Sequence, residues 1–187
     1  NLMRSFAGES QARNRYTYAA EAAKSQSLHV IEAVFKFTAN QEKEHGKIFY
    51  NFLKEMTGEN ITIDGSYPVD IYDDVLKLLR SAQHNEFEEF EPVYPDFAAV
   101  ANQEGFTNIG AKFNQIAKIE KTHGDRFGMF ADLLEQGKLF VSDVEEEWMC
   151  LNCGYVHKSS EAPKSCPVCS HPQGYFVRLK LAPFTTL

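Results

Sequence analysis

The chain has 187 residues, of which 26 are Asp or Glu and 19 are Lys or Arg, so its formal net charge is −7. This acidic balance argues against nucleic acid and anionic membranes as partners, because both select basic surfaces. The apolar runs are too short for a transmembrane helix, which needs about 20 apolar residues. No secretory signal is recognisable, so we expect a cytoplasmic protein. Since the sequence opens with Asn1 rather than a methionine, we also expect a few residues upstream of it.

The cysteines divide the chain into two parts. All four lie between Cys150 and Cys169, and the first 149 residues contain none. A disulfide framework would spread cysteines through the fold, whereas a cluster in a cytosolic chain indicates a metal site. We therefore expect a cysteine-free domain over 1–137, a linker over 138–146 with a solvated acidic run, and a small β-rich module over 147–187 that a metal stabilises.

The first part is predicted to form long amphipathic helices over about 2–27, 29–56, 70–103 and 108–134. Thr57-Gly58 is a C-terminal signal for the second helix. The run Asp64-Gly65-Ser66-Tyr67-Pro68 is typical of a loop and lies in a long connection between the second and third helices. Helices joined in this way predict a four-helix bundle with a crossover connection.

Pro92 and Pro95 interrupt the pattern of the third helix. Each lacks a backbone donor and clashes with the carbonyl four residues earlier. We expect a local distortion rather than the end of the helix, because residues 96–103 stay amphipathic. The loosened turn would lie beside Glu89 and would allow it to move.

Two of the predicted helices repeat one pattern of residues. Phe35, Ala39, Glu42, Lys43, His45, Gly46 and Phe49 recur 78 positions later as Phe113, Ala117, Glu120, Lys121, His123, Gly124 and Phe127. A single Glu-x-x-His pair is usually a solvated polar pair on a surface helix. Two pairs flanked by Phe and Ala that mark the buried side instead indicate metal ligands, because buried carboxylates and imidazoles must be paired or bind metal.

The other two helices supply further carboxylates. Glu9 lies on the first helix, and Glu86 and Glu89 lie three residues apart on the third. Di-iron carboxylate proteins use one Glu from each of two helices and a Glu-x-x-His pair from each of the others. The candidate ligands are Glu9, Glu42, His45, Glu86, Glu89, Glu120 and His123, which is one carboxylate more than this pattern needs. Tyr16 and Tyr94 are candidates for hydrogen bonds to the ligands.

The cysteines form two short motifs, Cys150-Leu-Asn-Cys153 and Cys166-Pro-Val-Cys169. Two turns that each present a pair of sulfurs predict a tetrahedral four-thiolate site. Zinc and iron both suit sulfur ligands, and the spacing does not choose between them. Iron would make the module a one-electron relay for the di-iron site, whereas zinc would stabilise the module.

Taken together, these residues resemble the rubrerythrin family over essentially the whole chain. The resemblance rests on the segment from Phe6 to Tyr18, on Glu42-Lys-Glu-His45 and Glu120-Lys-Thr-His123, on the stretch from Glu86 to Pro95, and on the cysteine motifs. It implies a mainly α fold: a ferritin-like bundle with two non-haem irons, followed by a β-rich rubredoxin-like domain with one iron on four cysteines.

The resemblance also implies an activity, the reduction of hydrogen peroxide to water by a peroxidase. Electrons would come from NAD(P)H through separate reductases or small redox proteins such as rubredoxin. The chain would form a homodimer or a higher homo-oligomer, in which the rubredoxin-like iron of one subunit approaches the di-iron site of another. Glu89 and His45 match by position the carboxylate and the histidine that exchange on one iron in this family.

Charge counting gives a reason for such an exchange. Five glutamates carry five negative charges, whereas two ferrous ions carry four positive charges, so one carboxylate can leave the reduced site in favour of neutral His45. Two other functions are compatible with parts of the sequence. The bundle alone would suit an iron-storage ferroxidase, and a zinc-filled cysteine site would suit an interaction protein with a structural bundle.

Overall fold

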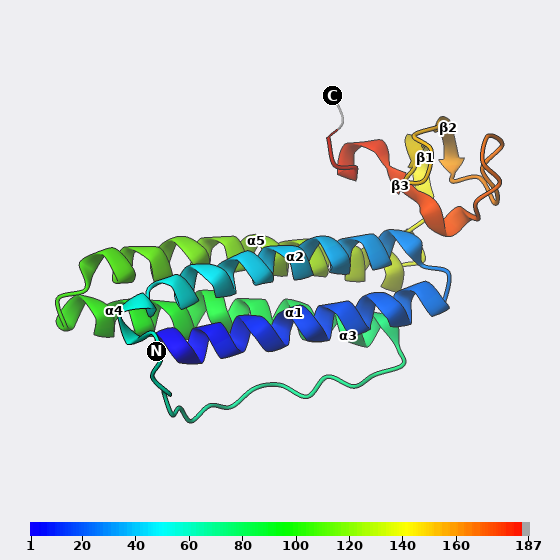
Figure 1. Cartoon of the computed structure of the whole chain (residues 1–187). Helices are drawn as coiled ribbons and strands as arrows, with labels where there is room; N and C mark the ends of the chain where they lie inside the picture. The colour runs from blue at the N-terminus through cyan, green and yellow to red at the C-terminus, as the bar shows by residue number, and fades with distance from the viewer. Residues whose placement is uncertain (185–187) are drawn as a thin grey trace.

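The structure, a computed structural model, describes residues 1–184, so the last residues of the predicted second domain, 185–187, lie outside the described part. Long helices form a bundle, and a small sheet lies beside one end of it (Figure 1). The bundle consists of α1 (Leu2–Ser25), α2 (His29–Asn51), α3 (Val75–Glu88), α4 (Tyr94–Gln103) and α5 (Thr107–Glu135). No helix within residues 1–184 is long and apolar enough to cross a membrane.

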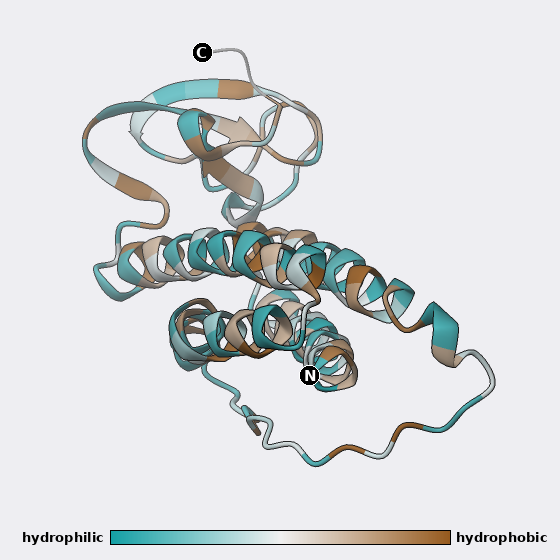
Figure 2. Cartoon of the chain, turned by 90° about the vertical axis from the view of Figure 1, so that its left-hand side faces the viewer, coloured by the Kyte–Doolittle hydropathy of each residue, from teal (hydrophilic) through white to brown (hydrophobic). Residues whose placement is uncertain are grey.

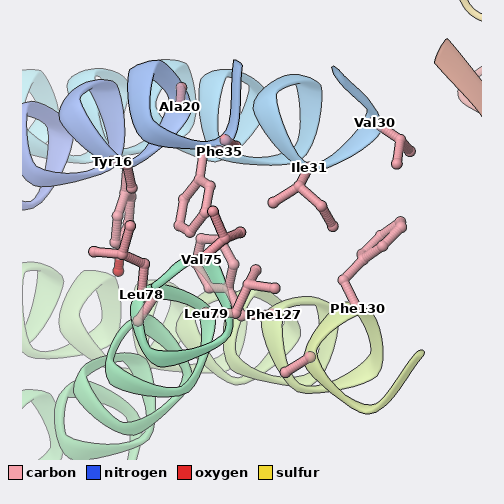
Figure 3. Packing of buried hydrophobic residues seen from close by; sticks show 14 of the residues in the cluster. Tyr16, Ala20, Val30, Ile31, Phe35, Val75, Leu78, Leu79, Phe127 and Phe130 are labelled. Atoms are coloured by element: carbon pink, nitrogen blue, oxygen red, sulfur yellow. The ribbon is translucent and has the colours of Figure 1, made fainter. Parts of the chain in front are cut away.

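The bundle interior has aromatic clusters on both sides of a polar layer. In one cluster, Phe127 packs against Tyr16 and Phe35, with ring centroids 5.0 Å and 5.1 Å away (Figure 3). In the other, Phe49 stacks on Phe113 at 4.9 Å. The repeated sequence pattern explains this arrangement, because its two Phe positions lie about two turns before and one turn after the Glu-x-x-His pair. The pair is thereby confined to the layer between the clusters.

The third bundle helix is distorted where the prolines predicted it. A π-helical turn, η2 (Glu89–Val93), contains Pro92 and joins α3 to α4. The backbone N–H of Tyr94 donates to the carbonyl of Glu89, five residues back. The helix therefore resumes after the distortion, as expected.

Two helix boundaries differ from the sequence expectation. α2 ends at Asn51, and residues 54–56 form a short 3₁₀ turn, η1 (Lys54–Met56), rather than a continuation of the α-helix. α3 begins at Val75 and not at Asp70, because the Asp74 side chain accepts hydrogen bonds from the backbone N–H groups of Leu76 and Lys77 at 2.8 Å and 3.3 Å. A side chain that caps the first turn fixes where a helix starts.

The crossover segment, residues 57–74, runs along α1 on the side of the bundle away from the sheet (Figures 1 and 2). The Arg4 guanidinium donates to the Asp64 carbonyl at 3.1 Å, and Arg15 pairs with Asp70 at 2.9 Å. The Tyr67 hydroxyl donates to the carbonyl of Arg4 at 3.0 Å. Contacts with α1 thus hold the middle of the segment, from Asp64 to Asp70.

The cysteine module, residues 141–184, is built on an antiparallel sheet with strand order β2-β1-β3. Its strands are β1 (Val141–Cys150), β2 (Val156–Glu161) and β3 (Phe176–Arg178), and short 3₁₀ turns, η3 (Gln173–Tyr175) and η4 (Leu179–Leu181), flank β3. β1 begins inside the segment 138–146 that the sequence assigned to a linker. Its pairing with β2 is irregular between Val141 and Glu146. The exact domain boundaries stay a prediction.

The module is docked on the turn between α1 and α2. Val177 of β3 joins the core that contains Val30 and Phe130 of the bundle. The Tyr175 ring stacks on His29, with centroids 4.1 Å apart. Gly174 lies so close to the turn that a methyl group on it would reach within 1.8 Å of the Ser27 carbonyl oxygen.

We expect Gly174→Ala to loosen this docking, because a backbone oxygen cannot rotate away from the added methyl group. Overpacking of this kind costs about 1–3 kcal/mol, and we expect a lower thermal midpoint and faster amide exchange at Val177. Gly8→Ala is the matched control, since its methyl group would meet ordinary contacts at 3.6 Å and 4.0 Å. Equal thermal midpoints for the two variants would contradict the docking described here.

Candidate metal centres

The polar layer of the bundle contains carboxylates and imidazoles that are withdrawn from solvent. Its buried members are Glu9, Glu42, His45, Glu86, Glu120 and His123, each at most 5% exposed. They come from α1, α2, α3 and α5, so every helix that crosses the layer contributes at least one. Burial of so many ionisable groups is costly unless a counter-charge lies among them.

The buried groups form two overlapping clusters. Glu9, Glu42, His45 and Glu120 place ligand atoms within 4.8 Å of one another, and so do Glu42, Glu86, Glu120 and His123. Glu42 and Glu120 belong to both clusters, so these two carboxylates are positioned to bridge two ions. The imidazoles are stacked, with centroids 5.6 Å apart.

Each histidine is surrounded by carboxylate oxygens. His45 Nδ1 lies 2.9 Å from Glu120 and 3.1 Å from Glu42, and His123 Nδ1 lies 2.9 Å from the same two residues. Burial alone would lower the pKa of both imidazoles, but these carboxylates raise the pKa of His45 to about 9 and that of His123 to about 12. In the absence of metal, protons on the imidazoles therefore provide the counter-charge.

The remaining carboxylates cannot all ionise together. Burial and the neighbouring Glu42 raise the pKa of Glu86 to about 8. Burial and the neighbouring Glu120 raise the pKa of Glu9 well above its usual range. Glu42 is the exception, because the two neighbouring histidines outweigh burial and lower its pKa to about 2. The layer therefore contains more carboxylates than its two protonated histidines can neutralise.

Glu89, also predicted as a ligand, lies outside both clusters. It is half-buried at the start of the π-helical turn, whereas Glu86, one turn earlier, is buried. Burial, together with Glu86, raises its pKa well above the usual range for a carboxyl group. Glu89 is thus close to the layer and electrostatically coupled to it without taking part in either cluster.

Tyrosines and glycines complete the layer. The Tyr16 hydroxyl donates to Glu86, and the Tyr94 hydroxyl donates to Glu9, as the sequence predicted. The sequence alone does not explain why each repeat has a glycine after its histidine. A methyl group on Gly46 would lie 3.2 Å from Glu9 Cβ, and one on Gly124 would lie 3.0 Å from the Phe87 ring. The glycines allow the neighbouring helices to bring their carboxylates close.

Unpaired polar atoms show that the layer fits metal ions. Within residues 1–184, the buried side-chain oxygens and nitrogens without a hydrogen-bond partner belong to Glu9, Glu42, Glu86, Glu120, His123 and Ser5. Buried polar groups are normally satisfied. All of these residues except Ser5 are candidate ligands, and carboxylate with imidazole is a donor set that suits iron.

The cysteine module presents its sulfurs in a second cluster. Cys150 Sγ lies 3.7 Å from Cys169 Sγ, and Cys153 Sγ lies 3.6 Å from Cys166 Sγ. A tetrahedral ion with metal–sulfur bonds of about 2.3 Å requires sulfurs about 3.8 Å apart. The backbone N–H of His171 lowers the pKa of Cys169 to about 6, which favours the thiolate form that binds metal. The geometry fits one ion.

The metal-free bundle should lose stability as pH rises. The folded chain keeps a proton on Glu86 up to about pH 8 and on His45 up to about pH 9, whereas the unfolded chain releases them near 4.5 and 6.5. The unfolded state binds fewer protons in this range, so the free energy of unfolding falls as pH increases. The lowered pKa of Glu42 makes the free energy of unfolding rise with pH instead. This effect is confined to strong acid, because Glu42 is ionised in both states at higher pH.

Thermal unfolding of the metal-free protein at about pH 5.5 and about pH 8.5 measures this effect, and we expect a midpoint several degrees lower at the higher pH. The metal-loaded protein is the control, because its titrating groups outside the polar layer are the same. Metal replaces the protons, so its stabilisation should grow with pH. A metal-free midpoint that stays constant or rises relative to the loaded form would contradict the proton assignment.

Comparisons with known proteins agree with both centres. A family model described as Rubrerythrin matches residues 1–131, and one described as the rubredoxin-like domain of rubrerythrin matches residues 148–177. The chain is 46% identical over 177 residues to a rubrerythrin of Clostridium perfringens, covering 94% of this chain and 91% of that protein. It is 46% identical over 180 residues to a rubrerythrin of Porphyromonas gingivalis, covering 96% and 88%.

Solved structures show the same arrangement of elements. The fully reduced, all-ferrous state of nigerythrin superposes with a TM-score of 0.64 at 28% identity, covering 95% of this chain and 84% of that chain. The mixed-valence state of nigerythrin gives 0.63 with the same identity and coverage. The chain therefore belongs to the rubrerythrin family and combines a ferritin-like di-iron bundle with a rubredoxin-like four-cysteine domain.

Proposed function

We propose that this chain is a peroxidase that reduces hydrogen peroxide to water, with electrons that enter through the iron of the cysteine module. Its family is generally one of oxidoreductases and peroxidases. The overall reaction consumes one peroxide, two electrons and two protons and yields two waters. The observation that carries the proposal is the pair of clusters that share Glu42 and Glu120, because cleavage of the O–O bond needs two electrons at one place.

We assign the ligands of the single iron as Cys150, Cys153, Cys166 and Cys169, and the di-iron ligands as the clustered residues Glu9, Glu42, His45, Glu86, Glu120 and His123. Glu89, which lies outside the clusters but close to Glu86, is the seventh di-iron ligand that we assign. When bound, the two ferrous ions of the bundle supply one electron each. Tyr16 and Tyr94 hold Glu86 and Glu9 in place by hydrogen bonds. Burial and neighbouring carboxylates raise the pKa of both tyrosines well above the usual value, so they keep their protons and remain donors.

The supply of electrons favours a homodimer. The cysteine module is docked at His29, and His45 lies further along α2 by about 24 Å, at a rise of about 1.5 Å per residue. Electron tunnelling slows steeply over such a distance, so the module would serve the di-iron centre of a second subunit. The electrons would originate from NAD(P)H and arrive through a reductase or a small redox protein such as rubredoxin.

A peroxide pulse on the anaerobically reduced protein tests the activity. Ferric iron on four cysteines is red, so we expect the colour to return rapidly, with about two electrons consumed per peroxide. Glu42→Gln should slow this return by more than about a hundredfold, because it removes a carboxylate shared by both clusters. Glu44→Gln, two residues away on the same helix and exposed, is the matched control and should react like the wild type.

A reduced protein that ignores peroxide would overturn the proposed function. The same samples separate it from the alternatives. A zinc-filled cysteine site would leave the native protein colourless, and an iron-storage protein would form a large hollow shell on gel filtration. Neither alternative explains why a four-thiolate module accompanies the shared carboxylates.

Glu89 and His45 are expected to exchange as ligands when the redox state changes. Glu89 lies outside both clusters on a π-helical turn whose backbone is loosened by Pro92, whereas His45 belongs to one cluster. This is the arrangement that charge balance predicts for the reduced form, and the higher charge of ferric iron should draw Glu89 in. Crystal structures of the reduced and oxidised protein measure this, and identical ligands in both would refute the exchange.

A further inference from the structure

A cavity of about 450 Å³ lies between α1, the distorted third helix and the crossover segment. Its lining includes Ser5 and Gly8 of α1, Tyr67 of the crossover segment, and Glu89 and Tyr94. Glu89 is a candidate ligand, and Tyr94 donates to another one, Glu9. The cavity therefore extends from the crossover segment to Glu89 and Tyr94 at the edge of the polar layer.

The Ser5 hydroxyl is a second, independent indication that a ligand binds in this cavity. Its side chain is 3% exposed, and its hydroxyl oxygen is buried without a hydrogen-bond partner among the described residues. It lies four residues before Glu9 and so occupies the same face of α1. The other unpaired buried polar atoms belong to candidate metal ligands, which leaves the Ser5 hydroxyl as a group whose partner would lie in the cavity.

The charges around the cavity admit small molecules without selecting for either sign of charge. Arg4 and Arg15 line it together with Glu88 and Glu89, so the formal charges balance. Both arginines are further engaged by aspartates of the crossover segment. Hydrogen peroxide is uncharged at neutral pH and can both donate to and accept from a hydroxyl group.

At Gly8, side chains from two other elements approach α1. A methyl group there would lie 3.6 Å from Tyr67 Cε1 and 4.0 Å from Glu89 Oε1, so the Tyr67 ring and the Glu89 carboxylate approach the same point on α1 from different elements. Tyr67 is 39% exposed and is anchored through its hydroxyl to the carbonyl of Arg4. Its partly exposed ring therefore lies on the cavity wall beside Gly8.

We propose that this cavity is the route by which peroxide reaches the di-iron centre, with the Tyr67 ring partly closing its mouth and the Ser5 hydroxyl binding the molecule inside. The proposal rests on the proposed function for the identity of the entering molecule. The route itself is a property of α1, the crossover segment and the π-helical turn, and it applies to any small ligand of the irons.

Azide binding to the oxidised protein tests the route without turnover, because bound azide has its own infrared stretch. A change along the route alters association and dissociation equally and leaves the dissociation constant unchanged. We expect Gly8→Ile to slow both rates by at least about tenfold and Tyr67→Ala to speed both up. A changed dissociation constant with an unchanged association rate would mean that the variant disturbs the ligands and would overturn the route.

Matched controls exist on the same elements. Ala7→Ile adds bulk to α1 beside the cavity without lining it, and Tyr72→Ala removes an exposed ring from the crossover segment outside this cavity. Both should leave the azide rates as in the wild type. Tyr67→Ala removes a partly exposed side chain, so it keeps the test valid if Gly8→Ile fails to fold. Equal rates for Tyr67→Ala and Tyr72→Ala would contradict the proposed mouth.

The role of Ser5 is tested by the reaction of the reduced protein with peroxide. Loss of one hydrogen bond should slow the second-order step by about three- to tenfold in Ser5→Ala. Ser10→Ala, on the same helix but bonded to the Phe6 carbonyl at 2.6 Å, should leave it unchanged. Equal rates for the two variants would contradict the role of Ser5. If azide responds to the route variants but the wild type ignores peroxide, the route stands and the proposed function fails.

Discussion

Carboxylates and imidazoles converge in the interior of this bundle, and compensation of their charge is the constraint on which the remaining structure depends. Glu42 and Glu120 each approach both His45 and His123 within about 3.1 Å. Such a layer is stable only if protons or cations occupy it. Aromatic clusters enclose this layer on either side, and the tyrosine donors and the glycines beside it bring the carboxylates together. Two ferrous ions would supply four positive charges, whereas protons on the two histidines supply two.

The fold and the convergence of most candidate ligands could be predicted from the sequence because the layer leaves a local signature. The Glu-x-x-His pairs are three residues apart and share one helical face, and their flanking Phe and Ala positions identify that face as buried. The cysteine motifs are equally local. Pro92 and Pro95 likewise predicted a local distortion after which the helix resumes, because a missing backbone donor disrupts a helix at a defined place.

The parts that sequence reasoning missed depend on contacts between distant segments. The glycine after each histidine is explained by Glu9 and Phe87, which lie on other helices. Tyr67 appeared as a loop residue, and its place above Gly8 depends on how the crossover segment lies along α1. Ser5 could have been noticed, since it precedes Glu9 by one turn, but an unpaired hydroxyl is recognised only when its surroundings are known. The docking of the cysteine module through Gly174 is of the same kind.

The helical distortion connects the constraint in the interior with the surface of the protein. A regular helix would hold Glu89 and Glu86 on one face with equal rigidity, whereas the π-helical turn places Glu89 at its first residue, half-buried and beside a cavity. Glu89, the carboxylate that exceeds the charge of two ferrous ions, is therefore also the one that has space beside it. Glu89 lies outside the clusters and at the wall of the cavity, so the proposed ligand exchange and the proposed entry route share one side of the centre. The crossover segment lines that side through Tyr67, so under this proposal the long connection also controls access to the centre.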